Sequence, residues 1–107
     1  MNFLTGEVGP GPVFRGQGFE LPLRAPDAVA SVGVRPQAFR LAEDGPLAAE
    51  IDLVEPLGSE TFVHFSWGSQ PVVVRVPSEH AVRAGETLRF LVDAADVHRF
   101  DADGAAL

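Results

Sequence analysis

Hydrophobic residues alternate with small or polar residues along much of this chain, as in β-strands that bury one face. The clearest stretch is 47–67, in which residues 47–54 and 61–67 both follow this two-residue period. Between them, Pro56 and Gly58 are residues that favour a tight turn. The stretch therefore predicts a β-hairpin. The residues expected on its buried faces are Leu47, Ala49, Ile51, Leu53, Val63, Phe65 and Trp67.

Shorter runs with the same period predict further strands on both sides of this hairpin. They cover residues 13–15, 19–23, 29–35, 72–76, 87–92 and 97–100. The 9 Pro and 11 Gly residues divide the chain into short pieces, which suits an all-β fold better than a helical one. Single helical turns are expected only at 36–38 and 93–96. The sequence therefore predicts an all-β chain with two one-turn helical breaks.

Two segments follow the same plan. Val32–Leu41 and Phe90–Phe100 each contain a strand, a polar residue, a one-turn break, and then an apolar-basic-x-apolar or closely similar extended piece. This echo predicts that two related β units pack side by side. At 107 residues the chain is long enough for one domain, 1–107, with both units in a shared core.

Charge and composition exclude several classes of protein. The formal net charge of −7 and the absence of Lys argue against nucleic-acid binding, which needs cations to replace the counterions of phosphates. No apolar run approaches the roughly 20 residues of a membrane helix, so direct membrane insertion is not expected. The chain has no Cys, which excludes disulfides and thiolate metal sites.

No motif for catalysis or cofactor binding is present. The sequence lacks GxxxxGK[ST], HExxH and GxSxG, and its histidines, His64, His80 and His98, have no metal-ligand spacing. We therefore expect no catalytic, cofactor-binding or metal-ligating residue. Trp67 and Phe100 are large apolar residues near segment ends, and they either close the core or form an association surface.

Four segments together resemble a known family. They are MNFL, VGVRPQAFRLAE, GPLAAEIDLVEPLGSETFVHF and GETLRFLVDAADVHRFDADGAAL, and they span essentially the whole chain. In this order they resemble the C-terminal regulatory domain of the ATP-binding subunits of ABC carbohydrate importers, of the maltose and glycerol-phosphate type. The family has Glu and His where this chain has Gln37 and Ala38, so roles of those two family side chains do not carry over.

The resemblance implies an OB-like β-barrel of the TOBE class, built from two interleaved β units. It also implies that Met1 is an internal residue of a longer protein. ATP and Mg would then bind only in an upstream ATPase domain, which also contacts the permease subunits. This chain would be a non-catalytic domain, excised from a cytoplasmic subunit that lies peripheral to the inner membrane.

The resemblance further implies a homodimer, with regulation by a protein or a small ligand. We expect the dimer contact to use exposed strand faces and two turns. The candidate interface residues are Gly58, Ser59, Glu60, Trp67, Val97 and Phe100.

An alternative function belongs to a different class. Related domains capture oxyanions, and here Ser59 and Thr61 are the candidate ligands for such a small-molecule site. The acidic net charge and the absence of Lys disfavour anion binding. A free-standing enzyme ranks below both, and a nucleic-acid binder ranks last, because the chain also lacks Tyr for base stacking.

Overall fold

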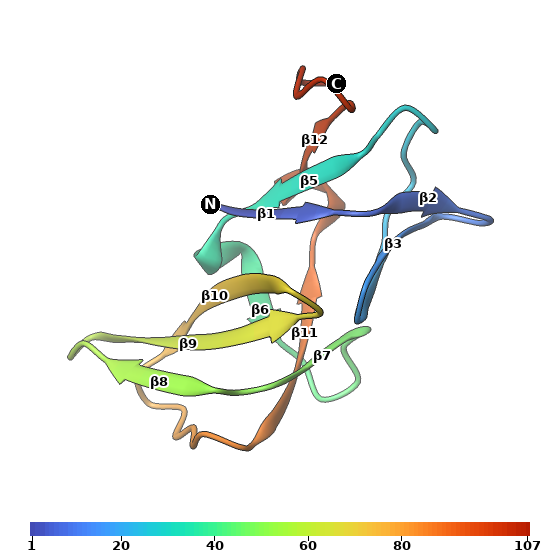
Figure 1. Ribbon diagram of the computed structural model, residues 1–107. Coiled ribbons are helices and arrows are strands. Elements are labelled where there is room, and N and C mark those ends of the chain that lie inside the picture. The colour runs from blue at the N-terminus through green and yellow to red at the C-terminus, as the bar shows by residue number, and fades with distance from the viewer.

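The chain folds into twelve short strands that form four three-stranded antiparallel sheets. This is seen in a computed structural model that describes residues 1–107 (Figure 1). The strands are β1 (Asn2–Thr5), β2 (Glu7–Gly9), β3 (Val13–Gly16), β4 (Phe19–Pro22), β5 (Ser31–Val34), β6 (Phe39–Leu41), β7 (Leu47–Glu50), β8 (Leu53–Pro56), β9 (Glu60–Trp67), β10 (Gln70–Pro77), β11 (Thr87–Val92) and β12 (His98–Phe100). Two three-residue 3₁₀ helices, η1 (Pro36–Ala38) and η2 (Ala94–Asp96), are the expected helical breaks. The prediction of an all-β chain is confirmed.

The four sheets belong to two equivalent halves. The first half runs β1, the meander β2–β3–β4, β5, η1 and β6, and the second runs β7, the meander β8–β9–β10, β11, η2 and β12. In each half the opening strand pairs with the strand after the meander, with Leu4 opposite Val32 and Leu47 opposite Phe90. The last strand of each half then crosses over: β6 pairs with β11, and β12 pairs with β5. The halves are therefore interleaved, as predicted.

The register of the crossed strands explains the sequence echo. Leu41 lies opposite Phe90 between β6 and β11, and Arg99 lies opposite Val32 between β12 and β5. Val32 and Phe90 occupy the same place in their segments, as do Leu41 and Arg99. The two pairings are thus equivalent. The sheets remain four separate sheets rather than one closed hydrogen-bonded ring, so the OB-like barrel is an open version of that architecture.

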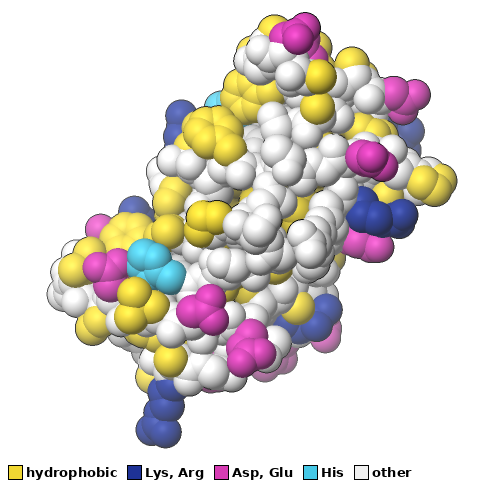
Figure 2. Space-filling model, in the orientation of Figure 1, with side chains coloured by type: hydrophobic (Ala, Val, Ile, Leu, Met, Phe, Trp, Pro, Cys, Tyr) yellow, Lys and Arg dark blue, Asp and Glu magenta, His cyan; other side chains and the backbone are white.

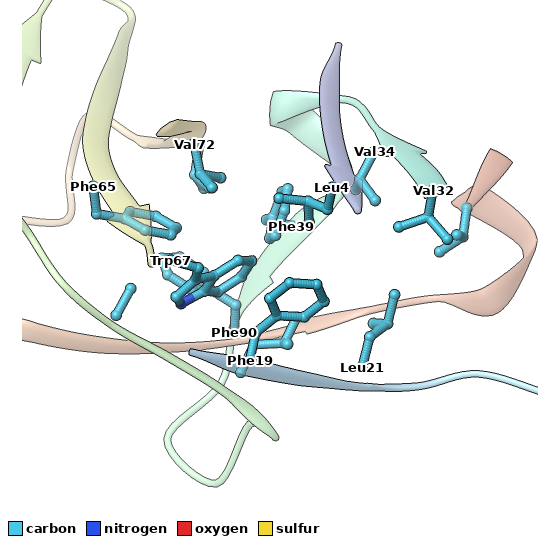
Figure 3. Packing of buried hydrophobic residues seen from close by; sticks show 14 of the residues in the cluster. Leu4, Phe19, Leu21, Val32, Val34, Phe39, Phe65, Trp67, Val72 and Phe90 are labelled. Atoms are coloured by element: carbon cyan, nitrogen blue, oxygen red, sulfur yellow. The ribbon is translucent and has the colours of Figure 1, made fainter. Parts of the chain in front are cut away.

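The core lies between the sheets and draws on both halves. It contains 21 buried hydrophobic residues, with Trp67 among its aromatic members (Figure 3). The Trp67 ring stacks on Phe19 at a centroid distance of 5.1 Å and meets Phe65 edge-on at 5.1 Å and Phe39 at 6.3 Å. Its indole N–H donates a hydrogen bond of 2.9 Å to the Ala48 carbonyl. Trp67 therefore joins aromatic residues of the two halves.

A buried polar residue makes a second connection between the halves. Asn2, in β1, is 8% exposed, and its amide nitrogen donates to the carbonyls of Val34 (3.1 Å) and Val73 (2.8 Å). Its amide oxygen accepts from the Val73 backbone N–H at 2.9 Å. The side chain thereby satisfies backbone groups on the outer edge of β10, which has no neighbouring strand on that side.

The predicted 47–67 hairpin is only partly correct. Its second part is a hairpin, because β8 pairs with β9, but β7 pairs with β11 in another sheet. The chain changes sheets at two consecutive residues: the Ile51 N–H donates to the Glu86 carbonyl, and the Asp52 N–H donates to the His64 carbonyl. The alternation is lost at this point, and Leu53, expected to be buried, is 53% exposed.

The remaining buried faces agree with the sequence pattern. Residues from the first meander and from the echoed strands are buried as expected, namely Phe19, Leu21, Leu23, Val32, Val34, Leu88 and Phe90. The predicted strand 29–35 is shorter in the structure, where β5 covers only Ser31–Val34. No helix has the length and apolar character needed to cross a membrane.

Candidate interaction surface

The outer face of the sheet β1–β5–β12 carries an exposed aromatic pair. Phe3 is 60% exposed, and its ring lies 5.9 Å from the half-buried ring of Phe100. Met1, 48% exposed, lies beside them over Gly33: a Cβ added at Gly33 would come within 2.5 Å of the Met1 sulfur. We call these residues, Met1, Phe3, Gly33 and Phe100, the Phe3–Phe100 patch.

Strand periodicity places Phe3 in solvent. Asn2 and Leu4 of β1 are buried, so the two residues that alternate with them, Phe3 and Thr5, must point outward. The sequence pattern indicates Phe100 as a candidate but does not indicate Phe3. The available signal is the alternation in residues 2–5, NFLT, which places Phe3 on the face opposite to Leu4. A Phe on the solvent face of a strand is a candidate for contact with another surface.

The strand residues that share the face of the patch are not acidic. Cross-strand pairing places Thr5, Ser31 and His98 on the same face as the patch, since Phe3 and His98 both lie opposite Gly33, and Thr5 and Phe100 both lie opposite Ser31. None of these residues is negatively charged, although the chain as a whole has a formal net charge of −7. These strand residues therefore add no repulsion toward an acidic partner.

Figure 2 shows how hydrophobic side chains are distributed on one side of the molecule. Yellow side chains gather at the top, over β5 and β12, and again at the lower left, over β8 and β9. Leu53 of β8 is 53% exposed and lies opposite His64 of β9, whose imidazole pairs with the Glu55 carboxylate.

Two of the predicted interface residues are buried. Trp67 is 3% exposed and Val97 is 5% exposed, and both belong to the hydrophobic core. The prediction is corrected for these two residues, because a side chain buried to this extent offers no contact area to a partner. Phe100 keeps an accessible ring and stays a candidate.

The other three predicted interface residues form the turn between β8 and β9. Gly58 has φ +84° and open space around its Cα, which is the left-handed conformation that glycine favours. Ser59 is exposed, and the Glu60 carboxylate forms an ion pair of 3.2 Å with Arg75. Figure 1 places this turn at one end of the molecule and β12 near the other, so Gly58, Ser59 and Glu60 do not share a patch with Phe100.

The titratable side chains are dispersed. No three His, Asp or Glu residues come together in a group that could hold a metal ion. Of the three histidines, His64 lies on β9 and pairs with Glu55, whereas His80 and His98 are exposed at separate places. The Phe3–Phe100 patch is the candidate site that remains, and its exposed Phe3 is a residue type enriched at protein interfaces.

Comparison with known protein families decides the classification. The family model of the TOBE domain matches residues 32–100, from β5 to the end of β12, which is more than half of the chain. The chain belongs to the TOBE domain family. The matched residues include both crossed strands, β6 and β12, and the strands β5 and β11 with which they pair. The interleaving of the halves therefore lies within the matched part of the chain.

Similar proteins are named as import or transport ATP-binding proteins. The TOBE domain is 35% identical over 111 residues to the sn-glycerol-3-phosphate import ATP-binding protein UgpC 3 of Agrobacterium fabrum, covering 97% of this chain and 31% of that protein. It is 40% identical over 116 residues to UgpC of Bordetella pertussis, covering 96% and 32%. It is 47% identical over 73 residues to the sulfoquinovosyl glycerol transport ATP-binding protein SmoE of Agrobacterium fabrum, covering 66% and 20%. The chain thus spans between a fifth and a third of these relatives.

Proposed function

We propose that this TOBE domain is the regulatory and dimerisation part of the ATP-binding subunit of an ABC carbohydrate importer. Its similarity to import ATP-binding proteins along nearly its whole length supports this assignment. The importer's cargo is proposed to be a sugar or a sugar-like glycerol compound, in keeping with the names of the relatives. The TOBE domain would itself be non-catalytic.

The remainder of the subunit would supply the other activities. The relatives extend well beyond the part that this chain matches. ATP and Mg would bind in that remainder, since this chain contains no GxxxxGK[ST] loop. The same part would contact the permease, and the whole subunit would work in the cytoplasm at the inner face of the membrane.

The dimer contact is proposed to include the Phe3–Phe100 patch, and this exposed aromatic pair is the observation that carries the proposal. Aromatic residues and Met are enriched at protein interfaces, and charged residues are depleted at their centres. The patch fits both criteria, because Phe3 is 60% and Met1 48% exposed and the strand residues that share their face are not acidic. A contact that persists while the ATPase parts separate would let a bound effector bias one state of the subunit.

The test is to compare self-association of the wild-type chain with that of Phe100→Ala by sedimentation and light scattering. Loss of the half-buried ring should weaken the dimer by about tenfold or more, as for a typical interface aromatic residue. Leu53→Ala, on the exposed face of another sheet, is the matched control and should leave the association unchanged. An equal monomer–dimer equilibrium for wild type and Phe100→Ala would refute the role of the patch.

The oxyanion-binding alternative has less support from the structure. Ser59 lies in the exposed β8–β9 turn, but Thr61 is 7% exposed and faces the interior. Glu60 lies between them and would repel an anion. The two candidate ligands therefore do not converge on one open site.

A further inference from the structure

A surface groove of about 580 Å³ lies where the two halves meet, and no residue of the Phe3–Phe100 patch lines it. One wall comes from η1 and β6 of the first half, and includes Gln37, Arg40 and Leu41. The other wall comes from the far end of the β9–β10 hairpin of the second half, and includes Glu60 and Arg75. The groove thus requires both halves to be in place.

Most polar side chains of the groove have no partner in the protein. Glu60 and Arg75 form an ion pair of 3.2 Å. The side chains of Gln37, Arg40 and Ser59 line the same groove and form no hydrogen bond or ion pair within the protein. An amide, a guanidinium and a hydroxyl are therefore available to a ligand, and they offer both donors and acceptors.

The charges of the groove balance. Arg40 and Arg75 contribute two positive charges, and Glu60 and Glu79 contribute two negative charges. An anion would meet the carboxylates, and a cation would meet the guanidinium groups. A neutral molecule rich in hydroxyl groups can donate to the carboxylates and accept from the guanidinium groups, while Leu41 offers an apolar contact for its carbon atoms.

We propose that this groove binds a neutral polyhydroxy compound, a sugar or a polyol. Such a site lies outside the proposed dimer contact and gives the TOBE domain a ligand of its own. Arg40 would donate to ligand hydroxyls, Gln37 would both donate and accept, and the Glu60–Arg75 pair would present one acceptor and one donor group.

The pseudo-symmetry of the fold offers a comparison for these polar residues. In the other half, the places of Gln37 and Arg40 are taken by Ala95 and His98. The hairpin that would form the second wall there is also shorter: β3 and β4 have 4 residues each, whereas β9 and β10 have 8 each. The same fold therefore exists once with the groove residues and once without them.

The test is a titration of the isotope-labelled chain with sucrose, followed by backbone amide NMR shifts. We expect saturable shifts confined to residues 37–41, 59–60 and 75–79. Arg40→Ala should weaken binding by about tenfold, since it removes a charged hydrogen-bond donor. The symmetry-related exposed variant His98→Ala is the matched control and should bind like wild type.

Several outcomes would overturn the proposal. They are shifts that rise linearly with sucrose, shifts centred elsewhere, and unchanged binding by Arg40→Ala. A parallel titration with sn-glycerol 3-phosphate distinguishes an anion site: saturable binding of the phosphate compound alone would also overturn it. Repeating the sucrose titration on Phe100→Ala keeps this result separate from the dimer proposal, because the groove should bind equally in that variant.

Discussion

Asn2 shows how one side chain can replace a strand. Its amide group exchanges two hydrogen bonds with the Val73 backbone, in the way that paired strand residues do, and adds a third bond to Val34. Because Asn2 is buried, water cannot take over these bonds if the amide is lost. The outer edge of β10 is therefore satisfied by a residue of the other half.

Asn2→Ala should lower the free energy of unfolding by about 2–3 kcal/mol, since it leaves buried backbone groups without partners. Urea denaturation followed by Trp67 fluorescence measures this directly. Gln70→Ala is the matched control: the Gln70 amide also joins β10 to β1, through Thr5, but these hydrogen bonds are exposed. Its removal should cost less than about 0.5 kcal/mol. Equal losses for both variants would contradict the role of burial.

Trp67 belongs to the core and Phe100 to the surface, so their substitutions should have different effects. Trp67→Ala should lower the free energy of unfolding by about 3–5 kcal/mol, because it opens a cavity between the halves. Such a loss is a large part of the stability of a small domain. Phe100→Ala should cost much less in unfolding and act mainly on self-association. A folded Trp67→Ala variant with normal stability would show that the indole is not essential to the core.

At the scale of elements, the two 3₁₀ helices differ in how they begin. The Asp93 side chain accepts a hydrogen bond of 3.2 Å from the Ala95 N–H at the start of η2. Arg35 holds the same place before η1 and makes no such bond, but Pro36 follows it and fixes the backbone there. One turn is thus held by a side-chain cap and its counterpart by a proline ring.

Asp93→Ala should therefore destabilise the domain by about 1 kcal/mol, the usual effect of losing a capping side chain. Arg35→Ala at the equivalent position should be nearly neutral. Thermal unfolding of both variants measures the difference. If the two variants shift the midpoint equally, the Asp93 bond contributes nothing beyond a surface substitution.

The elements that the sequence predicts well are those marked by a local pattern. Alternation located β9, β10 and β11, and turn residues located η1 and η2, because these signals are local. The break after β7 is not predicted, because Ile51 bonds to Glu86, just before β11, while Asp52 bonds to His64 of β9, and local sequence carries no mark of that change.

The candidate surfaces were predictable to different degrees. Phe100 stands out as a large apolar residue in a polar segment, but its partner Phe3 lies almost the whole chain away and becomes its neighbour only through β5. The groove draws Gln37, Ser59 and Arg75 from three segments, so no sequence motif links them. Strand faces can be inferred from alternation, whereas the meeting of distant segments depends on the topology.

For the whole molecule, the crossing of β6 and β12 makes each half depend on the other. Each half supplies the last strand of a sheet that the other half begins. A fragment of residues 1–44 would lack β11 and β12, and a fragment of residues 45–107 would lack β5 and β6. Neither fragment can build a complete sheet of either crossed type.

We therefore expect fragments 1–44 and 45–107 to be unfolded separately and to recover the native amide spectrum when mixed. The NMR spectra of each fragment and of the equimolar mixture test this, with the uncut chain as the reference. A native-like spectrum from one fragment alone would show that a half folds independently and would contradict the argument from the crossed strands.

The crossing also governs how the domain opens. Because each half completes a sheet of the other, one half cannot detach without exposing the core of both. Backbone amides in β5 and β11 should therefore exchange with deuterium through the same opening of the domain. The TOBE domain then has no state in which one half is loose and the other intact. A ligand that binds the closed form at one end of the molecule should therefore slow amide exchange at the far end as well, because both ends exchange through the same opening.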